Sequence, residues 1–287
     1  MRWRRARGQG RIEDRRGMGG VGMPLGVGGG GLGLVVLLLY VLLGGGGGGG
    51  GFEVPSPSAF PQAPAARGGE RGVEATQTKV DDFTQAVLGD VEATWRDIFD
   101  RAGKRYEPTT LVLFTNATRT ACGVGSAQTG PFYCPVDSKV YIDLSFFREL
   151  RGRFGAPGDF AQAYVIAHEV AHHVQNQLGI SDDVRREQQR DSDDANDLSI
   201  RLELQADCFS GVWAHSAYEA DLLEQGDLEE GLAAAAAVGD DRIQREATGR
   251  IDRESWTHGS SEQRTRWFRR GFDGGDPNGC DTFSGDV

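Results

Sequence analysis

The sequence predicts an α+β fold that is mainly helical with a small sheet and is preceded by one N-terminal transmembrane helix. Apolar residues recur at three- and four-residue spacing over residues 78–102 and 159–179, which indicates two amphipathic helices. Two short runs rich in β-branched and aromatic residues, at 109–116 and 139–147, indicate strands. Before all of these, the run LGLVVLLLYVLL at 32–43 lies in a stretch without charged residues.

The first 72 residues divide by composition into three segments: a basic segment at 1–24, a Gly-rich apolar segment at 25–51, and a Pro-, Ala- and Gly-rich linker at 52–72. The apolar run is shorter than the ~20 residues of a membrane span, but the uncharged glycines around it supply the missing length. Arginines before a span favour the cytoplasm, so we expect a single-pass protein of the cytoplasmic membrane with its N-terminus inside and its domain outside. A cleaved signal peptide stays open as the alternative, because its apolar region is equally short.

The remaining residues, 73–287, are enough for one domain with a substantial core. They are strongly acidic, because the whole chain of 287 residues has a net charge of −11 despite the seven arginines near its start. Nucleic-acid binding depends on Lys and Arg side chains that meet phosphates. We therefore expect no nucleic-acid partner for this domain.

Along the domain, the helix at 78–102 is followed by the two strands and then by the helix at 159–179. Asp159 is expected to cap that helix, with Gln162 three positions later, and Gly179 to end it. The charged residues at 181–197 indicate a solvated loop or an exposed helix. A long helix at 197–219 and shorter helices at 228–238 and 262–270 complete the predicted elements.

Four cysteines suit an oxidising compartment outside the cytoplasm. Cys122 and Cys134 flank a Gly- and Pro-containing loop that a disulfide could close, and Cys208 and Cys280 remain as a second possible pair. Four cysteines allow three connectivities, among which the sequence does not choose. No Cys-x-x-Cys spacing is present, which argues against a zinc site built from cysteines.

The segment His168-Glu169-Val170-Ala171-His172 has the pattern H-E-x-x-H on a predicted helix. Positions i and i+4 share a helix face, so His168 and His172 can point at one zinc ion. Glu169 would lie beside the open coordination position, where a carboxylate can act as the general base toward a zinc-activated water. His173 points about 100° away from His172, and we expect it to face solvent or to support a ligand from behind.

A catalytic zinc needs a third protein ligand. Glu203 and Asp207 are also four residues apart on a predicted helix, among apolar neighbours. We expect Glu203 to be the third ligand and Asp207 to accept a hydrogen bond from a ligand imidazole. Two solvated carboxylates on an acidic protein are the alternative.

These motifs resemble those of the gluzincin type of metallopeptidase, which has the thermolysin-like arrangement. More closely, the segments GPFYCPVDSKVYIDLSFF, VIAHEVAHHVQ, ELQADCFSGVWA and HGSSEQRTRWFRRGF, together with MRWRRARGQGRIEDRRG at the start, resemble the membrane-anchored bacterial neutral zinc metallopeptidase family. The resemblance spans nearly the whole chain outside the linker. It implies a zincin-like metallopeptidase domain with Zn²⁺ as cofactor and a peptide or protein as substrate.

Peptide hydrolysis also needs a group that stabilises the oxyanion of the tetrahedral intermediate. We expect His258, in a loop before a helix, to be this second catalytic residue, with His215, Tyr133 and Tyr141 as alternatives. By analogy with zincins, the strand at 139–144 would line the cleft and pair with an extended substrate. The expected function is a membrane-anchored zinc peptidase. The alternatives are a zinc amidohydrolase acting on a non-peptide or cell-wall substrate and a non-catalytic zincin-fold binding module.

Overall fold

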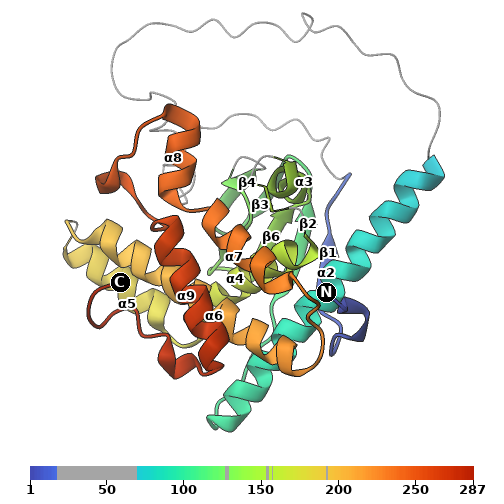
Figure 1. Ribbon diagram of the computed structural model, residues 1–287, viewed down its shortest axis with the longest axis horizontal. Coiled ribbons are helices and arrows are strands. Elements are labelled where there is room, and N and C mark those ends of the chain that lie inside the picture. The colour runs from blue at the N-terminus through green and yellow to red at the C-terminus, as the bar shows by residue number, and fades with distance from the viewer. Residues whose placement is uncertain (18–69, 127–128, 153–154, 157, 192) are drawn as a thin grey trace, which may run out of the picture.

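The computed structural model describes residues 1–17, 70–126, 129–152, 155–156, 158–191 and 193–287. It confirms the prediction of a mainly helical protein with a small sheet, an architecture consistent with a zincin-like domain (Figure 1). The main sheet has the strand order β1-β2-β6-β5, in which β1, β2 and β6 are parallel and β5 is antiparallel to β6. Its strands are β1 (Arg11–Asp14), β2 (Thr110–Phe114), β6 (Lys139–Asp143) and β5 (Phe132–Cys134). A separate antiparallel hairpin pairs β3 (Ala117–Thr120) with β4 (Gly123–Ser126).

The helices surround one long central helix, α4. The described helices are α2 (Glu70–Arg101), α3 (Ser145–Gly152), α4 (Asp159–Gln177), α5 (Ile180–Arg190), α6 (Ala195–Glu219), α7 (Asp227–Ala237), α8 (Asp240–Thr248) and α9 (Ser261–Gly274), with short 3-10 turns at Trp3–Arg5, Arg253–Ser255 and Pro277–Gly279. Helix α4 contacts α2, α6 and α7 as well as β5 and β6. It is therefore buried on nearly all sides.

Helices α6 and α9 pack backbone against backbone. A Cβ atom on Gly211 of α6 would lie 2.1 Å from the carbonyl oxygen of Phe268, and one on Gly271 of α9 would lie 1.9 Å from that of Cys208. Both distances are far inside van der Waals contact, so only glycine is compatible with this approach. The close packing fixes α9 along the helix that carries Glu203.

Two local expectations need correction, and a third is confirmed. The run at 139–147 is a strand only to Asp143, whose carboxylate accepts the backbone N–H groups of Asn116 and Ser145 and so starts helix α3 at Ser145. Asp159 is the first residue of α4 and not its cap, because Gly158 holds the cap position and the Asp159 carboxylate instead binds the α-amino group of Met1 at 2.6 Å. The charged segment after Gly179 is the exposed helix α5, and Gly179 itself has the left-handed φ of 80° that ends α4.

The N-terminal segment packs into the domain. Strand β1 pairs with β2, and the Arg7 side chain donates to the buried carboxylate of Asp90 on α2. The expected domain at 73–287 did not include this segment. Residues 1–17 and the helical body therefore pack as one unit.

The predicted membrane span at 25–51 and residues 52–69 of the predicted linker lie outside the described residues, whereas residues 70–72 belong to helix α2. Among the helices that the structure does describe, none combines the length and apolar character of a membrane-crossing segment.

All four cysteines form disulfides. Cys122, in the turn between β3 and β4, is bonded to Cys134 at the end of β5, and Cys208 on α6 is bonded to Cys280 in the C-terminal segment. These are the two pairs that the sequence suggested without deciding between connectivities.

Candidate metal centre

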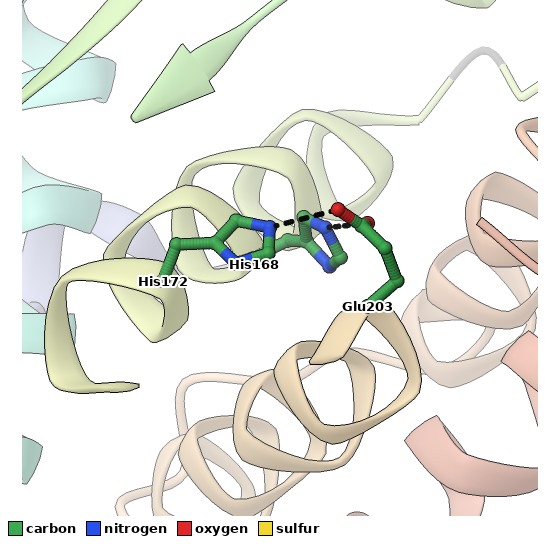
Figure 2. A group of neighbouring side chains, drawn as sticks. All are labelled: His168, His172 and Glu203. Atoms are coloured by element: carbon green, nitrogen blue, oxygen red, sulfur yellow. Dashed lines mark hydrogen bonds and ion pairs between the residues drawn. The ribbon is translucent and has the colours of Figure 1, made fainter. Parts of the chain in front are cut away.

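The buried face of α4 meets α6 at the H-E-x-x-H motif. His168 and His172 lie one turn apart on α4, and their ring centroids are 4.8 Å apart. Glu203 reaches them from α6, with Oε2 3.1 Å from His168 Nε2 and Oε1 3.4 Å from His172 Nε2. Figure 2 shows the two imidazoles and the carboxylate pointing toward one another. The structure therefore brings together the three residues expected to bind the metal.

Hydrogen bonds on the far side of each ring determine which atoms face the centre. His168 Nδ1 lies 3.0 Å from the carboxylate Oδ1 of Asp207, and His172 Nδ1 lies 2.9 Å from the amide oxygen of Gln175. Both partners accept hydrogen bonds, so each Nδ1 carries a proton and each Nε2 is the ring atom turned toward Glu203.

The inner donor set matches a catalytic zinc site. One ligand atom from each of His168, His172 and Glu203 lies within 4.8 Å of the other two. With Nδ1 protonated on both rings, each Nε2 can offer its lone pair to a cation that the Glu203 carboxylate would also bind. Two nitrogen donors and one oxygen donor, with a fourth position for water, form a preferred catalytic set for Zn²⁺. The residues present thus fit zinc.

Glu169 lies in this centre with a buried side chain, 7% exposed. Burial raises the pKa of its carboxyl group, while the neighbouring imidazoles of His172 and His168 oppose that shift. A carboxylate with a raised pKa is a better proton acceptor from water than an exposed one. For Glu203, burial would raise the pKa, but the contacts with His172 and His168 hold it well below its usual value.

Asp207 is fully buried and belongs to a network that the sequence did not predict. Its Oδ1 accepts hydrogen bonds from Tyr164 Oη at 2.5 Å and from Arg264 Nη2 at 3.0 Å, and its Oδ2 accepts from Arg264 Nε at 2.8 Å. Burial would raise the pKa of Asp207, but Arg264 and His168 lower it. Asp207 is thus a charged acceptor fixed against His168. The sequence alone assigns no role at the site to Tyr164 or to Arg264.

His258 lies in the loop before α9, against a buried carboxylate. Its Nδ1 is 3.1 Å from Asp240 Oδ1, and Asp240 Oδ2 accepts the backbone N–H groups of Thr257, His258 and Gly259. Burial would lower the pKa of His258, but Asp240 and the nearby charge of Glu203 raise it. These contacts favour the cationic form of an imidazole that lies near Glu203.

The alternative oxyanion candidates lie elsewhere. His215 is twelve residues beyond Glu203 on α6, roughly 18 Å along the helix axis, and bonds to the carbonyl oxygen of Phe272. The Tyr141 hydroxyl donates to Asp137 in the turn between β5 and β6. The Tyr133 hydroxyl bonds to His173 Nδ1 at 3.0 Å, away from the ligand atoms.

Two further expectations are wrong. His173 is not solvent-facing: it is 3% exposed, and its Nε2 bonds to the carbonyl oxygen of Glu107 at 2.7 Å, so it fastens α4 to the segment before β2. Strand β6 does not offer a free edge to a substrate over residues 139–141, which pair with β2 on one side and with β5 on the other. Within the described part of the sheet, the outer edge on this side belongs to β5.

Comparisons with known proteins agree with this centre. A family model described as "Putative neutral zinc metallopeptidase" matches residues 1–283. The chain is 51% identical over 218 residues to the uncharacterized protein YpfJ of Escherichia coli (strain K12), with 76% of each chain covered. It is 45% identical over 210 residues to the uncharacterized protein Rv2575 of Mycobacterium tuberculosis (strain H37Rv), with 69% of each chain covered. No solved structure matches the chain. The chain therefore belongs to the neutral zinc metallopeptidase family.

Proposed function

We propose that this protein is a zinc-dependent peptidase that hydrolyses peptide bonds of a peptide or protein substrate, with Glu169 as the general base. The observation that carries the proposal is the convergence of His168, His172 and Glu203 on one point, with the buried carboxyl group of Glu169 beside it. Membership of a zinc metallopeptidase family supports the same reaction class.

When bound, zinc would supply a Lewis acid and a water molecule of lowered pKa at the open position between these ligands. Glu169 would take the proton from the attacking water and then pass it to the leaving amine. Its burial supports this role, because a raised pKa makes the carboxylate a stronger base toward water.

His258 would stabilise the developing oxyanion as a cation. The Asp240 carboxylate holds the imidazole in place through Nδ1, which leaves Nε2–H free to donate to an oxyanion in the centre. The raised pKa of His258 favours the protonated, cationic form of this donor. Asp207, through its bond to His168 Nδ1, would keep that ligand in the tautomer that coordinates zinc.

The test compares the wild-type protein with Glu169→Gln, and it uses Glu187→Gln on the exposed surface of α5 as a matched control. Each protein is assayed for bound zinc and for cleavage of a peptide library analysed by mass spectrometry. We expect one zinc in all three proteins and cleavage by the wild type and the control, with a rate for Glu169→Gln lower by ~10²–10⁴-fold. Zinc binding by the wild type without cleavage of any peptide would instead favour an amidohydrolase with another substrate or a binding module.

A further inference from the structure

Gln175 connects the two helices that carry the metal ligands. It lies on α4 less than one turn after His172 and is fully buried. Its amide oxygen is 2.9 Å from His172 Nδ1, while its amide nitrogen donates to the carbonyl oxygen of Leu202 at 2.7 Å. Leu202 directly precedes Glu203 on α6, so one amide group contacts a ligand on one helix and the backbone next to a ligand on the other.

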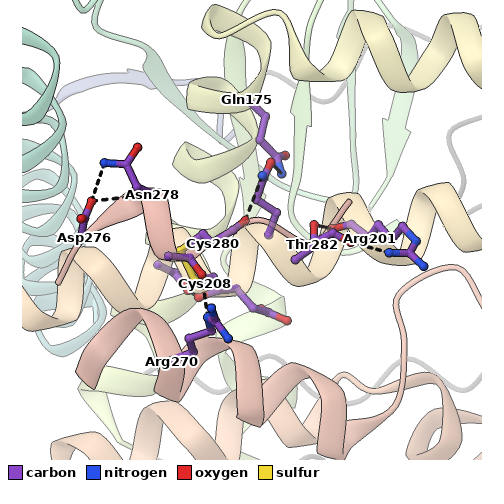
Figure 3. Close-up of a disulfide and its surroundings, with 12 residues drawn as sticks. Gln175, Arg201, Cys208, Arg270, Asp276, Asn278, Cys280 and Thr282 are labelled. Atoms are coloured by element: carbon purple, nitrogen blue, oxygen red, sulfur yellow. Dashed lines mark hydrogen bonds between the residues drawn. A yellow bond between two sulfur atoms is a disulfide. The ribbon is translucent and has the colours of Figure 1, made fainter. Parts of the chain in front are cut away.

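The same amide nitrogen continues into a second glutamine. Gln175 Nε2 donates to Gln205 Oε1 at 3.1 Å, and Gln205 Nε2 donates to the carbonyl oxygen of Cys280 at 3.1 Å. Cys280 is covalently bonded to Cys208, three residues after Gln205 on α6. Figure 3 shows Gln175 pointing from α4 toward the segment that carries this disulfide.

The backbone carbonyl groups at the two ends of this series of hydrogen bonds determine which amide groups donate and which accept. Backbone carbonyl groups can only accept hydrogen bonds, so Gln205 must place its amide nitrogen on Cys280 and its oxygen on Gln175. Gln175 must then place its nitrogen on Leu202 and Gln205, which leaves its oxygen for His172. His172 in turn must carry its proton on Nδ1, which is the tautomer whose Nε2 can bind a metal. A flip of either amide would place donor against donor in a buried region.

We propose that Gln175 is a positioning residue of the metal centre: it fixes the tautomer and ring orientation of His172 and holds α4 against α6 beside Glu203. The Gln205–Cys280 hydrogen bond, held in place by the Cys208–Cys280 disulfide, helps to fix which side of the Gln175 amide carries the oxygen and which carries the nitrogen. This role deepens the proposed function, because it concerns the ligands of the same zinc site.

The test measures zinc affinity by competition with a chromophoric chelator. Gln175→Met keeps the length of the side chain but removes the acceptor, and we expect it to weaken zinc binding by ~10–100-fold, as loss of a partner behind a ligand imidazole does. Gln205→Met leaves in place the bonds of Gln175 to His172 and to the Leu202 carbonyl group. Its loss of zinc affinity should therefore be clearly smaller than that of Gln175→Met. Gln177→Met is the matched control, because Gln177 lies on the same helix but bonds to the Glu107 carbonyl group and to no expected metal ligand.

A spectroscopic measurement separates positioning from a general loss of stability. We expect ¹⁵N chemical shifts of His172 in the metal-free wild type at pH 8 to report the Nδ1–H tautomer, and those of Gln175→Met to report a mixture. A predominant Nε2–H tautomer in the wild type would overturn the proposal, as would zinc affinity within twofold of wild type in folded Gln175→Met. Neither readout needs cleavage of a substrate, so failure of the proposed peptidase activity would leave this test unaffected.

Discussion

The ion pair between Asp207 and Arg264 offers the sharpest test of how the metal centre is supported. Both side chains are buried, and Arg264 is 3% exposed. In Asp207→Asn, an amide oxygen at the Oδ1 position can still accept from His168 and Tyr164, but the amide nitrogen then faces Arg264 Nε, where a donor meets a donor. The substitution therefore breaks the ion pair without necessarily removing the bond to His168.

The expected magnitude follows from leaving one charge buried alone. Removal of one partner of a buried ion pair costs about 3–5 kcal/mol of unfolding free energy, whereas removal of both partners costs far less. We expect this loss in Asp207→Asn and in Arg264→Met separately. In the double variant we expect a coupling energy of at least about 2 kcal/mol in favour of the pair. For a domain of this size, each single variant should melt roughly 6–20 °C below the wild type.

The assay is urea unfolding followed by circular dichroism, on metal-free and zinc-loaded protein. The slope of the unfolding free energy against urea concentration is compared among the wild type, the two single variants and the double variant. Single-variant losses below about 1 kcal/mol, or losses that add within about 0.5 kcal/mol in the double variant, would refute the argument that Asp207 and Arg264 neutralise each other in the core.

Three further predictions concern charged groups elsewhere in the domain. His258→Gln should lower kcat by ~10²–10³-fold with zinc content unchanged, measured by steady-state kinetics on a cleaved peptide; an unchanged kcat would remove His258 from the reaction. Asp240→Asn should lose stability mainly between about pH 4 and pH 6.5. In this range the raised pKa of His258, which stabilises the fold below 6.5, and the lowered pKa of Asp240, which stabilises it above 3.8, act together. A loss that is equal at all pH values, in melting curves from pH 3 to 9, would contradict the ion pair. Glu92→Gln should stabilise the protein at pH 9 by about 3 kcal/mol and have little effect at pH 4. Burial raises the pKa of Glu92 from 4.5 to about 7, so above that pH the folded protein must hold a buried charge that the glutamine lacks. Denaturant unfolding at the two pH values measures whether the variant is more stable than the wild type.

Residues of the centre that the sequence predicts lie within one helical motif, whereas those it does not predict act through contacts between distant segments of the chain. The spacing of His168, Glu169 and His172 follows from the pitch of one helix, so the sequence alone places them on one face. Glu203 could be proposed because a second motif of four-residue spacing lay among apolar residues.

Arg264 and Gln175 were missed for a physical reason. Arg264 is buried only because α9 packs along α6 through Gly211 and Gly271, which is a contact between segments about 60 residues apart. Gln175 looks like an ordinary polar residue near a helix end until the position of Leu202 is known. The same argument applies to β1, whose four residues carry no strand pattern of their own and become a strand by pairing with β2.

A zinc-edge anomalous diffraction experiment on crystals of the protein tests the central claim most directly. We predict one strong peak per chain, at about 2.0–2.2 Å from His168 Nε2, His172 Nε2 and a Glu203 carboxylate oxygen. A peak at another site, such as the carboxylate group of Asp159, Asp227 and Glu230, with none between these three side chains, would contradict it.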